Sequence, residues 1–279
     1  MTAWHPGLYV VATPLGNLED LSPRAKAAFQ TASLIAAEDT RVTGRLARAA
    51  GSTARLISLT EFNVRERTPE VLAAAVEGVA VLASDAGTPG VSDPGARLVA
   101  AAHAARVRVV PVPGPSALAA AISVAGFDSA VTVFAGFLPR KQGERRARLA
   151  ELAGPDRMVV CFESPGRVTA LLTDAAEVLG DPEAVVCREL TKLHEEVVRG
   201  RASELAERFR DARGEVTVVI GPAEPRTAGS HADAAALLAA FRRAGARRSA
   251  AAAEVARLTG ADRSALYALW EGPGGDGEA

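Results

Sequence analysis

The chain has few cysteines and few aromatic residues, and each shortage narrows what it can be. Cys161 and Cys187 are the only cysteines among 279 residues, and their wide separation argues against a disulfide framework or a structural zinc site. The four histidines are scattered rather than paired at metal-ligand spacing. No N-terminal segment joins basic residues to a long apolar run. We therefore expect a metal-free, soluble protein in the reducing cytoplasm, without membrane contact.

Composition limits both the cores and the partners. Hydrophobic residues form 48% of the chain and aromatic residues only 4%, so the cores must be built from Ala, Val and Leu. The formal net charge of −1 argues against a surface coated in positive charge that binds nucleic acid indiscriminately. A length of 279 residues favours two or three domains. Any contact with nucleic acid must therefore come from local basic clusters.

From Gly7 onward, short apolar runs alternate with helical stretches. This alternation predicts a mostly parallel sheet with helices on both faces. Two helices have clear starts, with Ser22 or Asp93 as the cap and Pro23 or Pro94 as the first helical residue. The predicted strands are 7–13, 34–37, 55–59, 79–83 and 107–111, and the predicted helices are 23–31, 41–50, 69–77 and 94–105.

The pattern changes after Gly126, where closely spaced strands predict a second α/β domain with an antiparallel part. Its predicted strands are 132–135, 157–162, 184–189, 196–201 and 215–220, and its helices are 143–152 and 167–179. Residues 222–230 have the composition of a linker. Helices at 233–244, 248–259 and 263–270 predict a helix-turn-helix-like module. The predicted domains are therefore 1–114, 115–224 and 225–279.

Three loops rich in glycine and proline, 13–17, 84–95 and 111–117, follow the first, fourth and fifth predicted strands. Ligands bind at the carboxyl ends of strands in such sheets, and Gly and Pro let the backbone approach a ligand closely. The loops contain no Lys, no Arg, no GxGxxG and no GxxxxGK[ST], which disfavours a nucleotide with phosphates. S-adenosylmethionine carries no phosphate, and its cationic sulfonium suits such loops. One loop of this kind is readily explained as a tight turn, but three at one sheet edge favour a site.

Several motifs occur in the order that is typical of the small subunit methyltransferase I family of ribosomal RNA methyltransferases, which the chain resembles from Leu8 to Trp270. The motifs are loop 13–17, Glu38-Asp39-Thr40-Arg41, the 84–95 run, Pro113-Gly114-Pro115-Ser116, Gly136-Phe137-Leu138-Pro139, Phe162-Glu163-Ser164 with Arg167, Arg188-Glu189-Leu190-Thr191-Lys192 and Ala265-Leu266-Tyr267. The sequence departs from the family at Phe162, where Tyr is frequent, at Gly166, where His is common, and at Gly90, where a bulky aliphatic residue is common.

The resemblance implies an α/β protein of the tetrapyrrole-methylase fold, with S-adenosylmethionine in the cleft between two α/β domains and a homodimer as the usual assembly. It also implies methylation of the ribose 2′-hydroxyl of a decoding-site cytidine, cytidine 1402, in the 16S rRNA of the small ribosomal subunit. Carried over position by position, the cofactor-binding residues are Pro14, Asp85, Thr88, Val91, Ser116, Ala117, Phe162 and Thr217.

Glu38, Asp39 and Arg41 follow the second predicted strand at the same sheet edge and are the candidate catalytic residues. Methyl transfer to a hydroxyl is an in-line displacement, so alignment of the reacting atoms supplies much of the acceleration, and a general base adds to it. In one interpretation, Asp39 or Glu38 orients or deprotonates the hydroxyl while Arg41 holds a phosphate. In the other, the motif is an internal ion pair that starts the next helix. The sequence leaves both open.

Two basic clusters are candidate RNA-binding surfaces, although a solvated helix face is the commoner meaning of such runs. The first cluster predicts RNA contacts by Arg140, Lys141, Arg145 and Arg146. The second lies between Ala240 and Arg263 and predicts contacts by Arg247 and Arg248.

Two other functions stay open. A carbon methyltransferase acting on a porphyrin-like tetrapyrrole shares the fold, and fold alone does not separate it from an RNA methyltransferase. A non-catalytic RNA-binding or assembly protein would keep the fold with an idle cofactor cleft. The C-terminal module and the Glu38 to Arg41 motif favour RNA, and the intact loops favour an enzyme.

Overall fold

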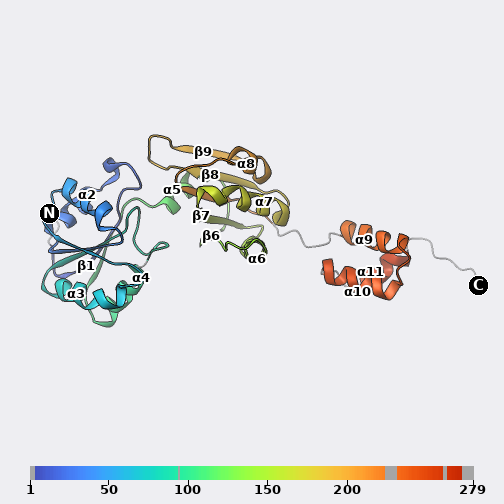
Figure 1. Cartoon of the computed structure of the whole chain (residues 1–279), viewed down its shortest axis with the longest axis horizontal. Helices are drawn as coiled ribbons and strands as arrows, with labels where there is room; N and C mark the ends of the chain where they lie inside the picture. Colours follow the sequence, from blue (N-terminus) through green and yellow to red (C-terminus); the bar gives the residue numbers. More distant parts are fainter. Residues whose placement is uncertain (1–3, 94, 224–230, 260–262, 272–279) are drawn as a thin grey trace, which may run out of the picture.

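The computed structural model describes residues 4–93, 95–223, 231–259 and 263–271. They form two five-stranded sheets with their helices and a group of three further helices (Figure 1). We call these the first unit (7–112), the second unit (117–220) and the C-terminal unit (231–271). The α/β class predicted from the sequence is confirmed, whereas the domain boundaries at 114 and 224 stay predictions.

The first unit is built on β1 (Gly7–Val11), β2 (Leu34–Ala37), β3 (Arg55–Ser58), β4 (Val79–Ala83) and β5 (Val109–Val112), with α1 (Pro23–Thr31), α2 (Thr40–Ala50), α3 (Val64–Glu77) and α4 (Gly95–Ala104). The strand order is β3-β2-β4-β1-β5, and all neighbours are parallel. Because strand residues alternate between faces, Tyr9 packs with α1 and α2 while Leu8 packs with α3 and α4. The predicted parallel sheet with helices on both faces is confirmed.

Helix α3 begins at Val64, earlier than the predicted start at Pro69. Val64 is buried in the same apolar cluster as Val71, so packing draws the turn before the proline into the helix. The hydroxyl of Thr68 donates a hydrogen bond to the Val64 carbonyl at 2.6 Å in that turn. Pro69 thus lies inside the helix instead of starting it. For α4, the Asp93 carboxylate accepts the Gly95 N–H at 2.9 Å, while Pro94 lies outside the described residues.

The second unit contains α5 (Ala117–Ala125), β6 (Val131–Phe137), α6 (Gln142–Leu152), β7 (Arg157–Glu163), α7 (Val168–Leu179), β8 (Glu183–Arg188), β9 (Glu196–Arg201), α8 (Ala202–Arg208) and β10 (Val216–Ile220). The strand order is β6-β7-β10-β8-β9; only β6 and β7 pair in parallel, which confirms the predicted antiparallel part. Helix α5 was not predicted, because its sequence ALAAAISVA is apolar on nearly every side and has no amphipathic period.

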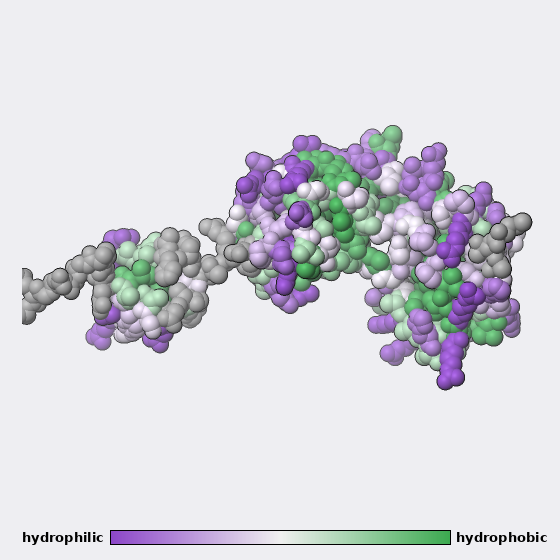
Figure 2. Space-filling view, turned by 180° about the vertical axis from the view of Figure 1, so that it is seen from behind, coloured by the Kyte–Doolittle hydropathy of each residue, from purple (hydrophilic) through white to green (hydrophobic). Residues whose placement is uncertain are grey.

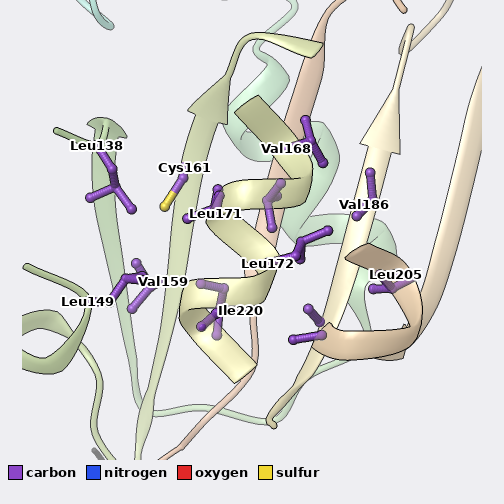
Figure 3. Close-up of a cluster of buried hydrophobic side chains, with 14 of the residues drawn as sticks. Leu138, Leu149, Val159, Cys161, Val168, Leu171, Leu172, Val186, Leu205 and Ile220 are labelled. Atoms are coloured by element: carbon purple, nitrogen blue, oxygen red, sulfur yellow. The ribbon is translucent and has the colours of Figure 1, made fainter. Parts of the chain in front are cut away.

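The two faces of the second sheet are covered differently. Helices α6, α7 and α8 cover one face, and Figure 3 shows Leu171 and Leu172 of α7 directed toward strand residues such as Val159 and Ile220. The other face carries α5, whose Ala121 and Ala125 pack on residues of β7, β8 and β10. The row of strand residues beyond the start of α5 is not covered by this helix and lines the site described below.

The C-terminal unit consists of α9 (His231–Arg243), α10 (Arg248–Thr259) and α11 (Arg263–Glu271), which confirms the three predicted helices. It has a core of its own, formed by Leu238, Val255, Leu266 and small alanines. The predicted linker residues 224–230 and the tail 272–279 lie outside the described residues. Within the described ranges, no helix combines the length and the apolar character needed to span a membrane.

Candidate functional site

The three glycine- and proline-rich loops of the first unit are tied to one another by hydrogen bonds. Thr13 and Gly87 exchange two backbone hydrogen bonds, of 2.9 and 3.0 Å, which join the loops after β1 and β4. The Thr88 hydroxyl donates to the Pro115 carbonyl at 3.0 Å and so joins the loop after β4 to the loop after β5. Since β4, β1 and β5 are adjacent and parallel, these loops form one wall at the carboxyl edge of the sheet.

The opposite wall is a single row of residues across the second sheet. Phe162 pairs in register with Phe137 on one side and with Thr217 on the other, and Thr217 pairs with Cys187. All four residues line a cleft of about 360 Å³ together with residues of the first unit. Figure 2 shows a band of hydrophobic residues on the second unit, on the side toward the first unit. The cleft therefore lies between the two units, as the resemblance implied.

Most of the predicted cofactor residues line this cleft. The lining residues among them are Thr88, Val91, Ser116, Ala117, Phe162 and Thr217. Pro14 is buried just before the lining residue Leu15. Asp85 does not line the cleft; its carboxylate accepts the backbone N–H of Asp39 at 2.9 Å. The structure thus brings six of the eight residues to one cavity, and cofactor binding by any of them stays a proposal.

The sequence did not single out several lining residues of the second unit. They are Phe137, Glu163, Ser164, Pro165, Cys187, Leu190, Gly214, Glu215 and Val216. Phe137 and Glu163 stand in quoted motifs, which was the available signal, whereas Gly214 and Glu215 reach the cleft only through the fold. Among the described lining residues there are two carboxylates and no Lys or Arg. The two carboxylates are paired with Arg167 and Lys192 behind the lining, and the lack of basic residues in the lining disfavours a phosphate.

Cys187 lines the cleft with a buried thiol. Burial among the apolar residues of the second unit, with a smaller effect of the Glu195 charge, raises the pKa of Cys187 to about 11. The thiol is therefore protonated at neutral pH.

The Asp39–Arg41 pair supports the structural interpretation of the Glu38 to Arg41 motif. The Asp39 carboxylate accepts the Arg41 backbone N–H at 2.8 Å and so caps α2, and it pairs with the Arg41 guanidinium at 2.7 Å. Hydrogen bonding from Arg41 lowers the pKa of Asp39 to about 2. A carboxylate so acidic is a poor general base. The Arg41 side chain is 85% exposed, so its outer N–H groups are open to a further anion.

The pKa values of Glu38 and Asp85 are raised, whereas the pKa of Asp39 is lowered. Partial burial beside the loop after β4 raises the pKa of Glu38, and the charges of Asp85, Asp93 and Glu61 raise it further. Burial also raises the pKa of Asp85, against the hydrogen bond from the Asp39 N–H. Glu38 lines a small crevice together with Pro89 and Asp93. Pro89 and Asp93 belong to the loop that also carries the cleft residues Thr88 and Val91. Glu38 is therefore a neighbour of the cleft and not part of its lining.

The prediction that Arg145 contacts RNA is corrected. Its side chain is 6% exposed, and its Nη2 pairs with the buried Asp174 at 2.6 Å. Its Nε donates to the same carboxylate at 2.7 Å, and its Nη1 donates to the Arg140 carbonyl at 2.9 Å. No edge of this guanidinium is left for a phosphate. Arg145 instead fastens α6 to α7.

Arg146 is also engaged within the second unit, while the start of the cluster is open. The Arg146 Nε donates to Asp174 at 2.7 Å, and its Nη2 pairs with Glu177. Arg140 is exposed, and Lys141 is 83% exposed with a solvent-exposed partner, Glu144. Of the first basic cluster, Arg140 and Lys141 thus remain the candidates for RNA.

In the C-terminal unit, Arg248 has a structural role. Its guanidinium lies 4.8 Å from the centre of the Tyr267 ring, and its Nη2 donates to the Tyr267 carbonyl at 3.2 Å. Arg242 lies over Trp270 in a similar way. Arg247 is exposed. Arg247 therefore remains the clearer candidate for RNA of the two predicted residues.

The second unit has a further hollow that the sequence did not indicate. It measures about 460 Å³ and is lined by four arginines, Arg188, Arg208, Arg210 and Arg213, with Glu196, Glu207 and Asp211 among the other residues. Arg213 directly precedes the cleft residues Gly214 and Glu215. Arg208, Arg210 and Arg213 lie close together at and after the end of α8, while Arg188 comes from β8.

Comparisons with known proteins agree with this fold and cleft. The family described as Tetrapyrrole (Corrin/Porphyrin) Methylases matches residues 7–206. Ribosomal RNA small subunit methyltransferase I of Mycobacterium tuberculosis strain CDC 1551 is 47% identical over 257 residues, covering 89% of this chain and 88% of the relative. The protein of that name from Mesorhizobium japonicum is 43% identical over 267 residues, covering 94% of this chain and 90% of the relative.

Solved structures show the fold alone, because their sequence identity is low. A cobalt precorrin-4 methyltransferase superposes with a TM-score of 0.59 at 17% identity, covering 77% of this chain and 94% of that chain. Uroporphyrin-III C-methyl transferase from Thermus thermophilus, complexed with S-adenyl homocysteine, superposes with a TM-score of 0.53 at 19% identity, covering 77% of this chain and 97% of that chain. With the family match and the close relatives, these findings confirm the resemblance noted from the motifs: the chain belongs to the tetrapyrrole methylase family and, within it, to the ribosomal RNA small subunit methyltransferase I family.

Proposed function

We propose that this protein transfers a methyl group from S-adenosylmethionine to the 2′-hydroxyl of a decoding-site cytidine, cytidine 1402, in the 16S rRNA of the small ribosomal subunit. The observation that carries the proposal is the cleft, whose two walls come from loops and strand ends of different units and whose described lining has carboxylates without basic residues. The relatives of the chain are named as ribosomal RNA small subunit methyltransferases.

The residues present fit S-adenosylmethionine. A volume of about 360 Å³ falls in the usual range for small-molecule sites. Ala86 and Gly87 of the first wall and Ala117 at the start of α5 are small and leave room in the cleft. Glu163 is paired with Arg167 and Glu215 with Lys192, and among the described lining residues there is no Lys or Arg that would repel a sulfonium or an amino group. Asp85 directly precedes the lining residue Ala86. We propose that its carboxylate fixes the loop after β4 by accepting the Asp39 N–H, and that it also accepts hydrogen bonds from polar groups of the cofactor.

When bound, the cofactor supplies an electrophilic methyl carbon whose bond to sulfur breaks as the ribose oxygen attacks, and the electron pair stays on sulfur. The two walls of the cleft align the reactants. We propose that Glu38 accepts the hydroxyl proton, because the Asp39 carboxylate is already held by Arg41. The exposed guanidinium of Arg41 is proposed to hold a phosphate near the target.

The Glu38→Gln variant tests the proton acceptor through the pH profile. A base works only when ionised, and the pKa of Glu38 is raised above the ordinary value of 4.5. Activity should therefore fall as the pH drops through this raised pKa, at a higher pH than for an ordinary glutamate. Glu38→Gln should lower kcat by roughly 100-fold and remove this acid limb, while calorimetry shows unchanged cofactor affinity.

Glu61→Gln is the matched control, since the Glu61 charge raises the pKa of Glu38 without being proposed to act itself. It should move the acid limb to lower pH and keep the maximal rate. If Asp39→Asn removes the acid limb and Glu38→Gln does not, the proton acceptor is Asp39.

RNA contacts are proposed for the open basic residues. In the arginine-lined hollow, Arg188, Arg208 and Arg210 are already paired with Glu196 or Glu207. Arg140, Lys141 and Arg247 are instead exposed. Such groups bind phosphates and make binding depend on salt. A homodimer in the cytoplasm stays the expectation from the family resemblance.

One experiment separates the candidate functions. The full chain and a chain ending at residue 228 are incubated with labelled S-adenosylmethionine and with unmethylated small subunits, bare 16S rRNA or a tetrapyrrole. We expect label on one ribose of the subunit RNA with the full chain, and much less with the shortened chain, although both bind the cofactor equally. Label on the tetrapyrrole alone would establish the carbon methyltransferase, and cofactor binding without any transfer would establish the non-catalytic protein.

A further inference from the structure

Phe137 is a large aromatic residue that lines the cleft and is nevertheless 59% exposed. It ends the row that forms the second wall. Along this row the residues become more open toward the edge strand, from Cys187 at 1% and Thr217 at 4% to the half-buried Phe162 and then Phe137. Phe137 therefore stands at the outer end of the cleft, where a ligand in the cavity meets solvent.

A β-bulge directs this ring into the cleft. Phe134 pairs with Val160 and Phe137 pairs with Phe162, with an irregularity between Phe134 and Gly136. Residues three apart in a regular strand point to opposite faces, but the extra residue brings Phe134 and Phe137 to the same face. Both rings accordingly contact Phe162, at centroid distances of 4.9 and 6.0 Å. Without the bulge, Phe137 would face away from the cleft.

The bulge and the segment after it are held by specific contacts. Gly136 has a φ of 60°, and a Cβ at this residue would lie 3.2 Å from the Ser92 hydroxyl oxygen of the first unit, so glycine suits both the backbone and the space. Arg167 donates to the carbonyls of Leu138 and Pro139 at 2.8 and 3.1 Å. Its partner is the buried Glu163, whose Oε2 lies 3.2 Å away. These contacts fix the backbone on both sides of the exposed Phe137 ring.

We propose that Phe137 is the stacking platform for the base of the target nucleotide, an inference that rests on the proposed function. The proposed methyl donor lies inside a cleft between two units, so we take the target nucleotide to be turned out of the RNA toward that cleft, and proteins hold unstacked bases on aromatic faces. Phe137 offers an exposed ring beside the cavity, and the exposed Arg140 and Lys141 follow it closely in the chain as partners for the adjoining phosphates. The cavity behind it is left for the cofactor.

The test uses Phe137→Ala, Phe137→Leu and Phe137→Tyr in the full chain. Loss of stacking should lower kcat/KM for unmethylated small subunits by roughly 5- to 150-fold in Phe137→Ala. Phe137→Tyr should restore the rate and Phe137→Leu should not, because only the aromatic ring stacks. Calorimetry should give the same S-adenosylmethionine affinity for all three variants. Phe62→Ala removes a ring that is 99% exposed in the loop after β3 and should behave as the unaltered protein.

Three results would overturn the assignment. A fall in cofactor affinity equal to the fall in methylation would place Phe137 in the cofactor site. Equal rates for the leucine and tyrosine variants would make it a hydrophobic filler. A changed sedimentation coefficient of Phe137→Ala would place it in a subunit interface. If the unaltered protein does not methylate small subunits, the proposed function fails instead, so the two failures are distinguishable.

Discussion

Replacing Ala117 with phenylalanine should lower the affinity for S-adenosylmethionine by on the order of 100-fold, because the added ring would fill the cleft and repacking around it is costly. Ala117 is the first residue of α5 and lines the cleft together with Phe162 and Thr217. Calorimetry with the cofactor measures the effect, and circular dichroism with urea unfolding establishes that the variant is folded. Methylation should fall in parallel when the cofactor is limiting.

Ala119→Phe is the matched control for this substitution. Ala119 lies on the same helix and is exposed, so the same change of side chain adds a ring to the surface. Its cofactor affinity should equal that of the unaltered protein. Full affinity in Ala117→Phe would show that the cofactor binds elsewhere and would remove the basis of the proposed mechanism.

Arg145→Ala should destabilise the second unit by about 3–5 kcal/mol, because it removes one partner of a buried ion pair and leaves part of the Asp174 charge uncompensated. Arg145 is 6% exposed and Asp174 is 1% exposed. Urea unfolding followed by circular dichroism measures the free energy of unfolding. Arg148→Ala, on the same helix, removes an arginine that is 44% exposed and paired with Glu151, and should change the free energy by less than about 0.5 kcal/mol.

A double substitution distinguishes the lost ion pair from a lost contact surface. Arg145→Met combined with Asp174→Leu removes both charges and should recover much of the stability, as buried pairs replaced by apolar residues often do. Arg146 and Gln142, which also bind Asp174, are open enough to be hydrated instead. If Arg145→Ala leaves stability unchanged and flattens the salt dependence of RNA binding, the original assignment to RNA is right.

The first unit was largely predictable because its signals are local. Each parallel strand is a short apolar run, and Ser22 with Pro23 marks a helix start that the structure has at the same residue. Helix α3 begins before the predicted residue. The burial of Val64 stabilises the helical turn that precedes Pro69, although a proline usually marks the first turn of a helix. Helix α5 was missed since its alanine-rich sequence carries no period.

The first wall of the site was predictable from strand order, whereas Phe162 and Thr217 of the second wall were predicted only through the family resemblance. The loops of the first wall follow successive strands of one sheet, so their meeting at one edge follows from strand order. The second wall depends on the register of β6, β7, β10 and β8, and this register places Phe137, Thr217 and Cys187 in one row although they are far apart in the chain. The role of Arg145 was mistaken for a similar reason: its partner Asp174 lies on another helix.

The protonated state of Cys187 bears on the methyl donor that we propose for the cleft. A thiolate is a stronger nucleophile than a ribose hydroxyl, and Cys187 lines the cleft proposed for a methyl donor. With a pKa of about 11, this sulfur carries its proton at neutral pH and does not compete for the methyl group. The burial that raises the pKa therefore lowers the thiolate fraction of a sulfur that stays in the wall of the cleft.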